Sequence, residues 1–296
     1  MAVSDSEDIM EACLKRTDGD MGNTVADSLA LDALLEMVYR DSGYDFREYR
    51  RGTVIRRLQR RLYLAGARTY SEYRRFLKTH PEEYQRLADY LTIKVSGFFR
   101  NQYAFQQVAG LVLPELLANK RGQGQRALRF WSAACARGEE PYSMAIILAE
   151  FLGDRQQDFD IEIHATDMSQ SALLAAQAGL YSNKEVGGLS PGILEKYFIC
   201  RDEGYAVSGS IRQMVSCSHF DLVSTITPPF TDVDCIFCCN ILIYLQKQIQ
   251  EKVLAMLYNA LATPGYLVLG EVETPTDNLR QKLECLDARA RIYKKV

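Results

Sequence analysis

From residue 128 onward, short apolar runs alternate with amphipathic helical stretches, and this alternation limits the fold more than any other feature. Strands are predicted at five apolar runs, the last of them at a sheet edge: residues 128–133, 160–167, 233–239, 266–270 and 288–294. Helices are predicted at residues 140–152, through Leu173 to Ala178, and over 249–261, where Pro264 and Gly265 end the last one. The alternation predicts an α/β fold on a doubly wound parallel sheet, which binds ligands at the carboxyl ends of its strands.

The preceding part of the chain is predicted to be helical and basic. Residues 28–105 carry apolar side chains at helix spacing and should form an all-helical domain. Residues 1–27 are interpreted as a mobile acidic tail, and residues 106–126, which end in a Gly- and charge-rich run, as a linker before a second domain over 127–296. Between Arg40 and Lys94, fourteen Arg or Lys face seven Asp or Glu, although the net charge of the chain is −3.

Four arginines of this basic block fall as two i,i+4 pairs on one helix face, away from its apolar residues: Arg56, Arg57, Arg60 and Arg61. A basic face of this kind typically meets nucleic acid, anionic lipid or an acidic protein surface, and a solvated face is the plain alternative. RNA is disfavoured, because no aromatic residues are interleaved with the arginines.

Composition and cysteine usage indicate a cytoplasmic protein. No run approaches the roughly 18 apolar residues of a membrane span, and the first residues lack the basic start and apolar core of a secretory signal. The eight cysteines are scattered along the chain, so we expect free thiols. Cys235, Cys238 and Cys239 have metal-like spacing but lie in an apolar strand, which favours buried thiols over a zinc site; no metal is expected.

The predicted strand ends carry polar residues suited to a nucleoside. After the first strand, a turn of small residues leads to Glu139 and Glu140 at a helix start. The second strand ends in Asp167, which could bind a ribose diol, and the third in Asn240. No G-x-G-x-x-G run is present, and the two glutamates would repel phosphates but suit a ligand with an ammonium and a sulfonium. S-adenosylmethionine is favoured, with a dinucleotide or a purely structural loop as alternatives.

Other candidate motifs have ordinary explanations. The three histidines are isolated, and His164 lies inside a strand, so none is expected to be catalytic. The Thr227–Phe230 run resembles the motif of nucleic-acid amino methyltransferases, but it lacks the leading amide or acid and precedes a strand, so a loop is expected. Trp131 is expected in the core, under the turn that follows the first strand.

Four collinear segments resemble the chemotaxis receptor methyltransferase family CheR: residues 96–100 (SGFFR), 130–143 (FWSAACARGEEPYS), 165–169 (ATDMS) and 236–244 (IFCCNILIY). The resemblance implies an N-terminal helical domain and a Rossmann-like methyltransferase domain with a small inserted β-subdomain at about 197–220. It implies S-adenosylmethionine-dependent methylation of glutamates on the cytoplasmic helical bundle of chemoreceptors, with S-adenosylhomocysteine as product. We expect a monomer that reaches membranes only through receptors and binds no nucleic acid.

The resemblance also implies roles for particular residues. Tyr244 and Arg100 match catalytic positions, with Tyr244 near the transferred methyl group. Positions that contact the cofactor are matched by Lys94, Ser96, Arg100, Glu139, Asp167, Asp221, Leu222, Cys239 and Asn240. The four arginines of the basic helix face are the expected receptor-docking residues.

The chain departs from the family pattern at two of these positions. Lys94 stands where the family has Asn, and Cys239 where it has Arg, which leaves a noncatalytic S-adenosylmethionine-binding module open. An RNA methyltransferase is a separate and less favoured alternative. The turn at residues 200–205 is short, so the chain is expected not to bind the receptor-tail pentapeptide through its β-subdomain.

Overall fold

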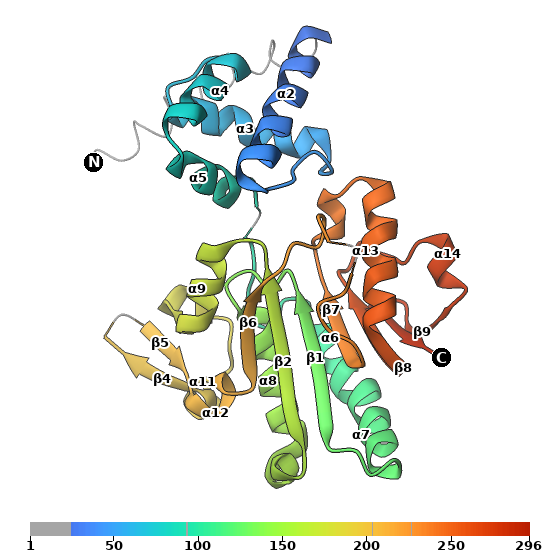
Figure 1. Cartoon of the computed structure of the whole chain (residues 1–296). Helices are drawn as coiled ribbons and strands as arrows, with labels where there is room; N and C mark the ends of the chain where they lie inside the picture. Colours follow the sequence, from blue (N-terminus) through green and yellow to red (C-terminus); the bar gives the residue numbers. More distant parts are fainter. Residues whose placement is uncertain (1–24, 93, 203, 226) are drawn as a thin grey trace. The chain divides into compact units, whose positions relative to one another are not determined.

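The computed structural model describes residues 25–296 except 93, 203 and 226, in two compact units, Met1–Leu91 and Thr92–Val296 (Figure 1). Most of the predicted acidic tail, residues 1–24, lies outside the described residues, and residues 25–27 begin the first described helix. The first unit is helical, with α2 (Val25–Ser42), α3 (Arg51–Leu64), α4 (Tyr70–Thr79) and α5 (Glu82–Leu91). The unit boundary therefore lies after Leu91, earlier than the predicted end of the helical domain at residue 105.

The helices of the first unit bury one apolar stripe each. Leu31, Leu34 and Val38 of α2 are buried, and so are Leu58 and Leu62 of α3, as their helical spacing predicts. The Thr69 side chain caps α4 by accepting a hydrogen bond from the Glu72 N–H. Apolar burial and capping thus explain why this segment folds as helices.

The second unit contains a seven-stranded sheet in the order β6-β2-β1-β7-β8-β10-β9. The strands in that order are Val215–His219, Asp160–Asp167, Ala127–Ala133, Val233–Cys238, Leu261–Leu269, Ile292–Lys295 and Leu283–Asp287. The first five are parallel, and β10 is antiparallel to β8 and β9. The sheet is mixed but mostly parallel, and the α/β, Rossmann-like class is confirmed.

Two strand predictions need correction. The last strand lies inside the sheet, because β9, which was not predicted, pairs with its outer side and forms the edge. Pro264 and Gly265 lie within β8, which starts directly after the helix α13 (Lys247–Ala260).

The strand order reverses between β1 and β7, and the carboxyl ends on either side of this switch point are where a sheet of this type binds ligands.

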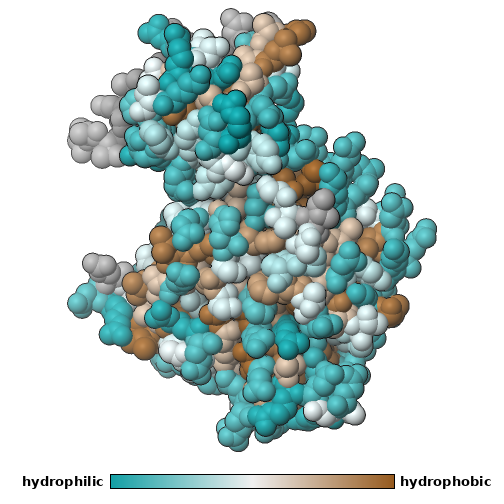
Figure 2. All heavy atoms as spheres, in the orientation of Figure 1, coloured by the Kyte–Doolittle hydropathy of each residue, from teal (hydrophilic) through white to brown (hydrophobic). Residues whose placement is uncertain are grey.

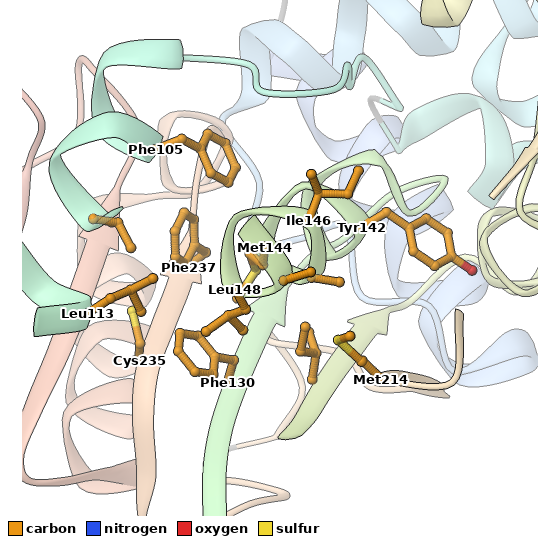
Figure 3. Packing of buried hydrophobic residues seen from close by; sticks show 14 of the residues in the cluster. Phe105, Leu113, Phe130, Tyr142, Met144, Ile146, Leu148, Met214, Cys235 and Phe237 are labelled. Atoms are coloured by element: carbon orange, nitrogen blue, oxygen red, sulfur yellow. The ribbon is translucent and has the colours of Figure 1, made fainter. Parts of the chain in front are cut away.

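The predicted linker, residues 106–126, is mostly helical and belongs to the core of the second unit. It contributes to α6 (Gln102–Gln107), the π-helix Val108–Val112 and α7 (Leu113–Gly122). In Figure 3, Phe105 and Leu113 of these helices lie beside Phe237 and Cys235 of β7, and the Phe105 and Phe237 ring centroids are 5.3 Å apart. The Gly- and charge-rich run that suggested a linker contains only the end of α7 and the turn after it.

Longer helices follow three neighbouring parallel strands of the sheet. They are α8 (Glu139–Leu152) after β1, α9 (Gln170–Ala178) after β2, and α13 after β7, with short helical turns at Gly153–Asp158, Leu242–Tyr244 and Asp277–Arg280. Met144 and Leu148 of α8 pack with Phe130 of β1 in the same apolar cluster (Figure 3). None of the described helices has the length and apolar character needed to cross a membrane.

A small antiparallel sheet lies between β2 and β6 in the sequence. Its order is β3 (Leu180–Tyr181), β5 (Gly204–Val207), β4 (Phe198–Arg201), flanked by α10 (Asn183–Val186), α11 (Pro191–Tyr197) and α12 (Gly209–Arg212). The predicted span of the β-subdomain, 197–220, was wrong at both ends. The small sheet already begins with β3, and Val215–His219 pairs with β2 as an edge strand of the main sheet.

On the molecular face shown in Figure 2, hydrophilic residues predominate.

Candidate active site

The loop after β1 is tightly bent and held against the end of β2. Ala134, Ala136 and Gly138 have φ angles of 66°, 48° and 95°. Gly138 is required here, because a Cβ atom would lie 2.9 Å from the Ala176 Cβ atom. The Ala136 N–H donates to Asp167 Oδ2 at 2.9 Å, which fixes the loop to the neighbouring strand.

Asp167 organises the end of β2 and keeps capacity to bind a ligand. Its Oδ1 atom accepts from the Ser169 N–H at 2.8 Å while Oδ2 accepts from Ala136, and the residue is 9% exposed. Burial raises the pKa of this carboxyl, and the two backbone hydrogen bonds oppose the shift. Each carboxylate oxygen can accept a further hydrogen bond, as from a ribose hydroxyl.

Glu139 opens α8 with a buried carboxylate that is only partly satisfied. It is 3% exposed, and its Oε2 atom has no hydrogen-bond partner among the described residues. Burial raises its pKa, while hydrogen bonds from its own backbone N–H and from the Ser96 side chain lower it. A buried acceptor without a partner costs free energy, so this atom is suited to a ligand's hydrogen-bond donor.

Glu140 lies on the other side of the same helix start. The Ser132 hydroxyl donates to its Oε1 atom at 2.6 Å. Burial raises the pKa of Glu140 to about 7, against the lowering effects of Ser132, the Cys239 thiol and the Arg100 charge. The carboxyl can therefore change its charge near neutral pH.

The segment around residues 94–100 lies beside these acids. The Lys94 amine donates to Ser171 Oγ at 2.7 Å, and its charge lowers the pKa of Asp167. The Arg100 guanidinium donates to the Val95 carbonyl at 2.5 Å and lies close enough to Glu140 to lower its pKa. The structure thus brings Lys94 and Arg100, together with Ser96, to the predicted site.

The end of β7 supplies the opposite side of the strand-order reversal. Cys239 contacts the Val268 carbonyl oxygen, 3.8 Å from Sγ, and lies against Glu140; burial raises its pKa. Asn240 adopts a left-handed conformation with φ 62°, and Tyr244 is half-buried in the helical turn that follows. Cys239, Asn240 and Tyr244 therefore reach the same strand ends as the acids.

Glu273, which was not predicted as a site residue, anchors this turn. Its Oε2 atom accepts from the N–H groups of Asn240 and Gly270, both at 2.8 Å, and Oε1 accepts from Ile243 N–H at 3.2 Å. The residue follows β8 only after exposed Glu271 and Val272, so the signal that identified Asp167, an acid at the end of a predicted strand, did not single out Glu273.

Asp221 and Leu222 lie in the loop after β6. Asp221 accepts from the Val223 N–H at 2.8 Å and from Ser224 Oγ at 2.6 Å, and Leu222 is buried. These contacts stabilise the loop itself. A contact of either residue with the cofactor stays a prediction.

The predicted docking face is divided in the structure. Arg57 donates from Nε to the Tyr90 carbonyl at 2.8 Å, and Arg61 binds Glu83 through two hydrogen bonds of 2.6 and 2.5 Å. Arg56 and Arg60 are exposed. Helix periodicity placed all four on one face, but α5 packs close enough to bind two of them within the unit.

Several other predictions concern the core and the cysteines. Trp131 is buried and donates to Thr166 Oγ1 at 2.9 Å, and Phe230 of the predicted loop stacks on His164 with ring centroids 3.9 Å apart. The seven described cysteines are free thiols, and Cys235 and Cys238 are buried. Within the described residues, no group of three or more His, Cys, Asp or Glu side chains is arranged to hold a metal ion.

The residues at the strand ends fit S-adenosylmethionine. A cationic ligand is favoured next to buried carboxylates, of which Glu139 has an unpartnered oxygen. Asp167 supplies acceptors for hydroxyl groups. The close packing of Gly138 against Ala176 holds the loop after β1 next to α9.

Comparisons with known proteins agree with this assignment. The family model for the CheR methyltransferase all-alpha domain matches residues 29–92, and that for the CheR methyltransferase S-adenosylmethionine-binding domain matches residues 94–292. Chemotaxis protein methyltransferase 1 of Pseudomonas aeruginosa is 38% identical over 195 residues, covering 64% of this chain and 69% of that protein. Chemotaxis protein methyltransferase 2 of the same organism is 33% identical over 243 residues, covering 80% and 84%.

A third relative is much longer than this chain. An uncharacterized 104.1 kDa protein of Rhodobacter capsulatus is 31% identical over 264 residues, which cover 89% of this chain and 27% of that protein. Because the two family models together span most of the sequence, the chain belongs to the CheR methyltransferase family, and its cofactor is S-adenosylmethionine.

Proposed function

We propose that this protein methylates glutamate side chains on the cytoplasmic helices of chemoreceptors and forms glutamate methyl esters. The relatives from Pseudomonas aeruginosa named chemotaxis protein methyltransferases support the chemotaxis assignment. The observation that carries the proposal is the set of buried acids at the carboxyl ends of β1 and β2, where Glu139 keeps an oxygen without a partner among the described residues.

The chemistry requires little beyond binding and orientation. When bound, S-adenosylmethionine supplies an electrophilic methyl group on a cationic sulfur. A receptor glutamate is already ionised at neutral pH, so no residue of this chain has to act as a general base. Correct alignment of two reactants can lower a barrier by roughly 7–11 kcal/mol.

The residues around the strand-order reversal would supply this alignment. Glu139 and Asp167 would hold the cofactor through their carboxylates, and Asn240 would contact it from the end of β7. Arg100, whose charge already acts on Glu140, would orient the incoming carboxylate, and the Tyr244 hydroxyl would fix the geometry at the methyl group. These roles follow from the family motifs and from the positions of the residues.

Receptor docking is proposed for Arg56 and Arg60 only. Both are exposed on α3, whereas Arg57 and Arg61 are bound to α5. An acidic receptor helix is the partner that two exposed arginines one helical turn apart would favour. We further propose that the protein works in the cytoplasm as a monomer, without a pentapeptide tether.

Transfer of a radiolabelled methyl group tests the proposal. The protein is incubated with labelled S-adenosylmethionine and membranes that contain chemoreceptors. Label should appear on the receptor and be released as methanol by mild base, since esters are base-labile. Label that resists base would identify methylamine formation and contradict the ester product.

A noncatalytic cofactor-binding module is the second candidate. It is favoured by Cys239, which replaces the family's arginine and lies against Glu140 without adding a positive charge. Calorimetric binding of S-adenosylmethionine without methyl transfer to any receptor would select this candidate.

A further inference from the structure

Glu273 joins two separate segments at the proposed methyl-transfer site. Its carboxylate accepts hydrogen bonds from the N–H groups of Asn240 and Ile243, after β7, and of Gly270, at the end of β8. The residue is 4% exposed, and no ion pair joins it to a lysine or arginine among the described residues. Its partners are therefore backbone amides from two chain segments.

The backbone around this carboxylate leaves little room for adjustment. A Cβ atom on Gly270 would lie 2.7 Å from Glu273 Oε2 and 2.8 Å from the Asn240 nitrogen. Asn240 itself is in the left-handed region, which Asn adopts more readily than most residues with a side chain. A carboxylate suits this position because it only accepts hydrogen bonds, and bonds to an ionised acceptor are the stronger kind.

We infer that Glu273 is a positioning residue for methyl transfer, which fixes Asn240 through Oε2 and the Leu242–Tyr244 turn through Oε1. The two oxygens serve different parts of the proposed site, since Asn240 matches a cofactor position and Tyr244 a catalytic one. The inference deepens the proposed function and rests on it for the catalytic readout. Burial raises the pKa of Glu273, and the backbone hydrogen bonds oppose that shift, which agrees with a carboxylate held by amides.

The division between the two oxygens predicts different effects for two variants. In Glu273→Gln, the amide oxygen can keep the two bonds of Oε2, and the NH2 group then faces the Ile243 N–H, donor against donor. The turn that carries Tyr244 should loosen while Asn240 stays in place. In Gly270→Ala, the added methyl group crowds Asn240 and Glu273 Oε2, so the cofactor side should be disturbed more.

The experiment compares these variants with Glu271→Gln, an exposed carboxylate two residues before Glu273. For Glu273→Gln we expect kcat to fall about 10-fold while the Kd for S-adenosylhomocysteine stays within about 3-fold of wild type. For Gly270→Ala we expect that Kd to rise about 10-fold. Glu271→Gln should match the wild type in both.

Hydrogen exchange of the peptide that contains residues 239–245 gives a readout that does not require a receptor. Glu273→Gln should speed exchange in this peptide while a peptide from the middle of α8 keeps wild-type protection. Should Glu273→Gln lose its fold, Gly270→Ala carries the test through the same peptide and the cofactor Kd. Absence of methyl transfer by the wild type would contradict the proposed function, and exchange and binding would then decide the role of Glu273 alone.

Unchanged exchange in residues 239–245, or an equal effect of Glu271→Gln, would overturn the inference. A uniform fall in kcat, cofactor affinity and protection throughout the second unit would also overturn it, because a merely structural residue has that effect.

Discussion

Two buried glutamates, one in each unit, show how differently this chain treats a buried charge. Glu83 of α5 is 1% exposed, and its carboxylate accepts two hydrogen bonds from Arg61 and one of 2.8 Å from the Tyr73 hydroxyl. Glu139 of α8 is 3% exposed, with one oxygen unpartnered among the described residues. Glu83 is satisfied by its own unit, whereas Glu139 is left with a capacity that only another molecule can use.

The comparison separates stabilising from binding roles. A buried carboxylate paired with a guanidinium and a hydroxyl joins α3, α4 and α5, so its removal should affect folding. A buried carboxylate with an unpartnered oxygen makes the fold less stable and creates a site that favours a ligand with a cationic donor. Neutralising Glu83 should therefore lower the stability and leave the cofactor affinity unchanged. Neutralising Glu139 should raise the stability and lower the cofactor affinity.

The largest expected effect is at Glu83. Glu83→Gln leaves the Arg61 guanidinium without its counter-charge and should lower the free energy of unfolding by about 3–5 kcal/mol. Urea unfolding measures this change, with exposed Glu82→Gln as the matched control. The cofactor Kd of the folded variant should equal that of the wild type, and a weaker Kd would contradict the separation of roles.

The next effect concerns Glu140 and pH. Its pKa is about 7 in the folded protein, above the ordinary 4.5, so the folded state binds the proton more tightly than the unfolded state. Its contribution to stability is complete below pH 4.5 and is lost as pH rises to 7, by about 3 kcal/mol. The stability of Glu140→Gln relative to wild type should therefore increase by that amount from pH 4.5 to pH 8. A constant difference across this range would show that Glu140 is not buried as a neutral acid.

Glu139→Gln should separate affinity from stability. Loss of the charge should raise the Kd for S-adenosylmethionine about 100-fold, or about 2.7 kcal/mol. The apo protein should at the same time melt at a higher temperature at pH 7, because burial raises the pKa of Glu139 and so disfavours its charge. Calorimetry measures the Kd and thermal unfolding measures the melting temperature. A lower melting temperature with an unchanged Kd would place Glu139 with Glu83 as a stabilising residue.

The arginines of α3 extend the comparison to positive charge. Arg56 and Arg60 are exposed, unlike Arg61, so the double variant Arg56→Glu/Arg60→Glu should raise the receptor KM about 10-fold with the cofactor Kd within 2-fold. Lys247→Glu/Lys252→Glu, at exposed positions on α13, makes the same change in net charge and serves as control. Equal receptor KM values for the two double variants would contradict a docking role for Arg56 and Arg60.

The smallest effect is expected from two tyrosine hydroxyls. Tyr73→Phe removes the hydroxyl bond to Glu83 and should lower stability by about 1 kcal/mol without changing turnover. Tyr244→Phe should leave stability unchanged and lower kcat about 5-fold, or about 1 kcal/mol. Full turnover in Tyr244→Phe would show that its hydroxyl has no part in methyl transfer.

The fold was predictable where the hydrophobic pattern has a clear period. The run from residue 160 to 167 gives β2 without error, and Glu139–Leu152 differs from its predicted helix by one residue. The helices within residues 106–126 were not predictable, because a run of Gly and charged residues can mark either the end of a helix or a linker. Its assignment depends on Phe105 and Leu113 packing with β7, a contact between distant parts of the chain.

The site was predictable only as far as strand ends could be located. Asp167 ends a predicted strand, Asn240 directly follows one, and Glu139 follows the short turn after another; the structure places all three at neighbouring carboxyl ends. Glu273 follows β8 after exposed residues, so nothing in its own segment shows that it reaches the end of β7. The division of the arginine face was equally hidden, because it depends on Glu83 and the Tyr90 carbonyl of another helix.

A crystal structure of the protein soaked with S-adenosylhomocysteine tests the central claim most directly. The account predicts electron density for the nucleoside with its hydroxyl groups at Asp167 and a polar donor of the ligand within hydrogen-bond distance of Glu139 Oε2. A ligand bound elsewhere, or a saturated soak with no density around these two carboxylates, would contradict it.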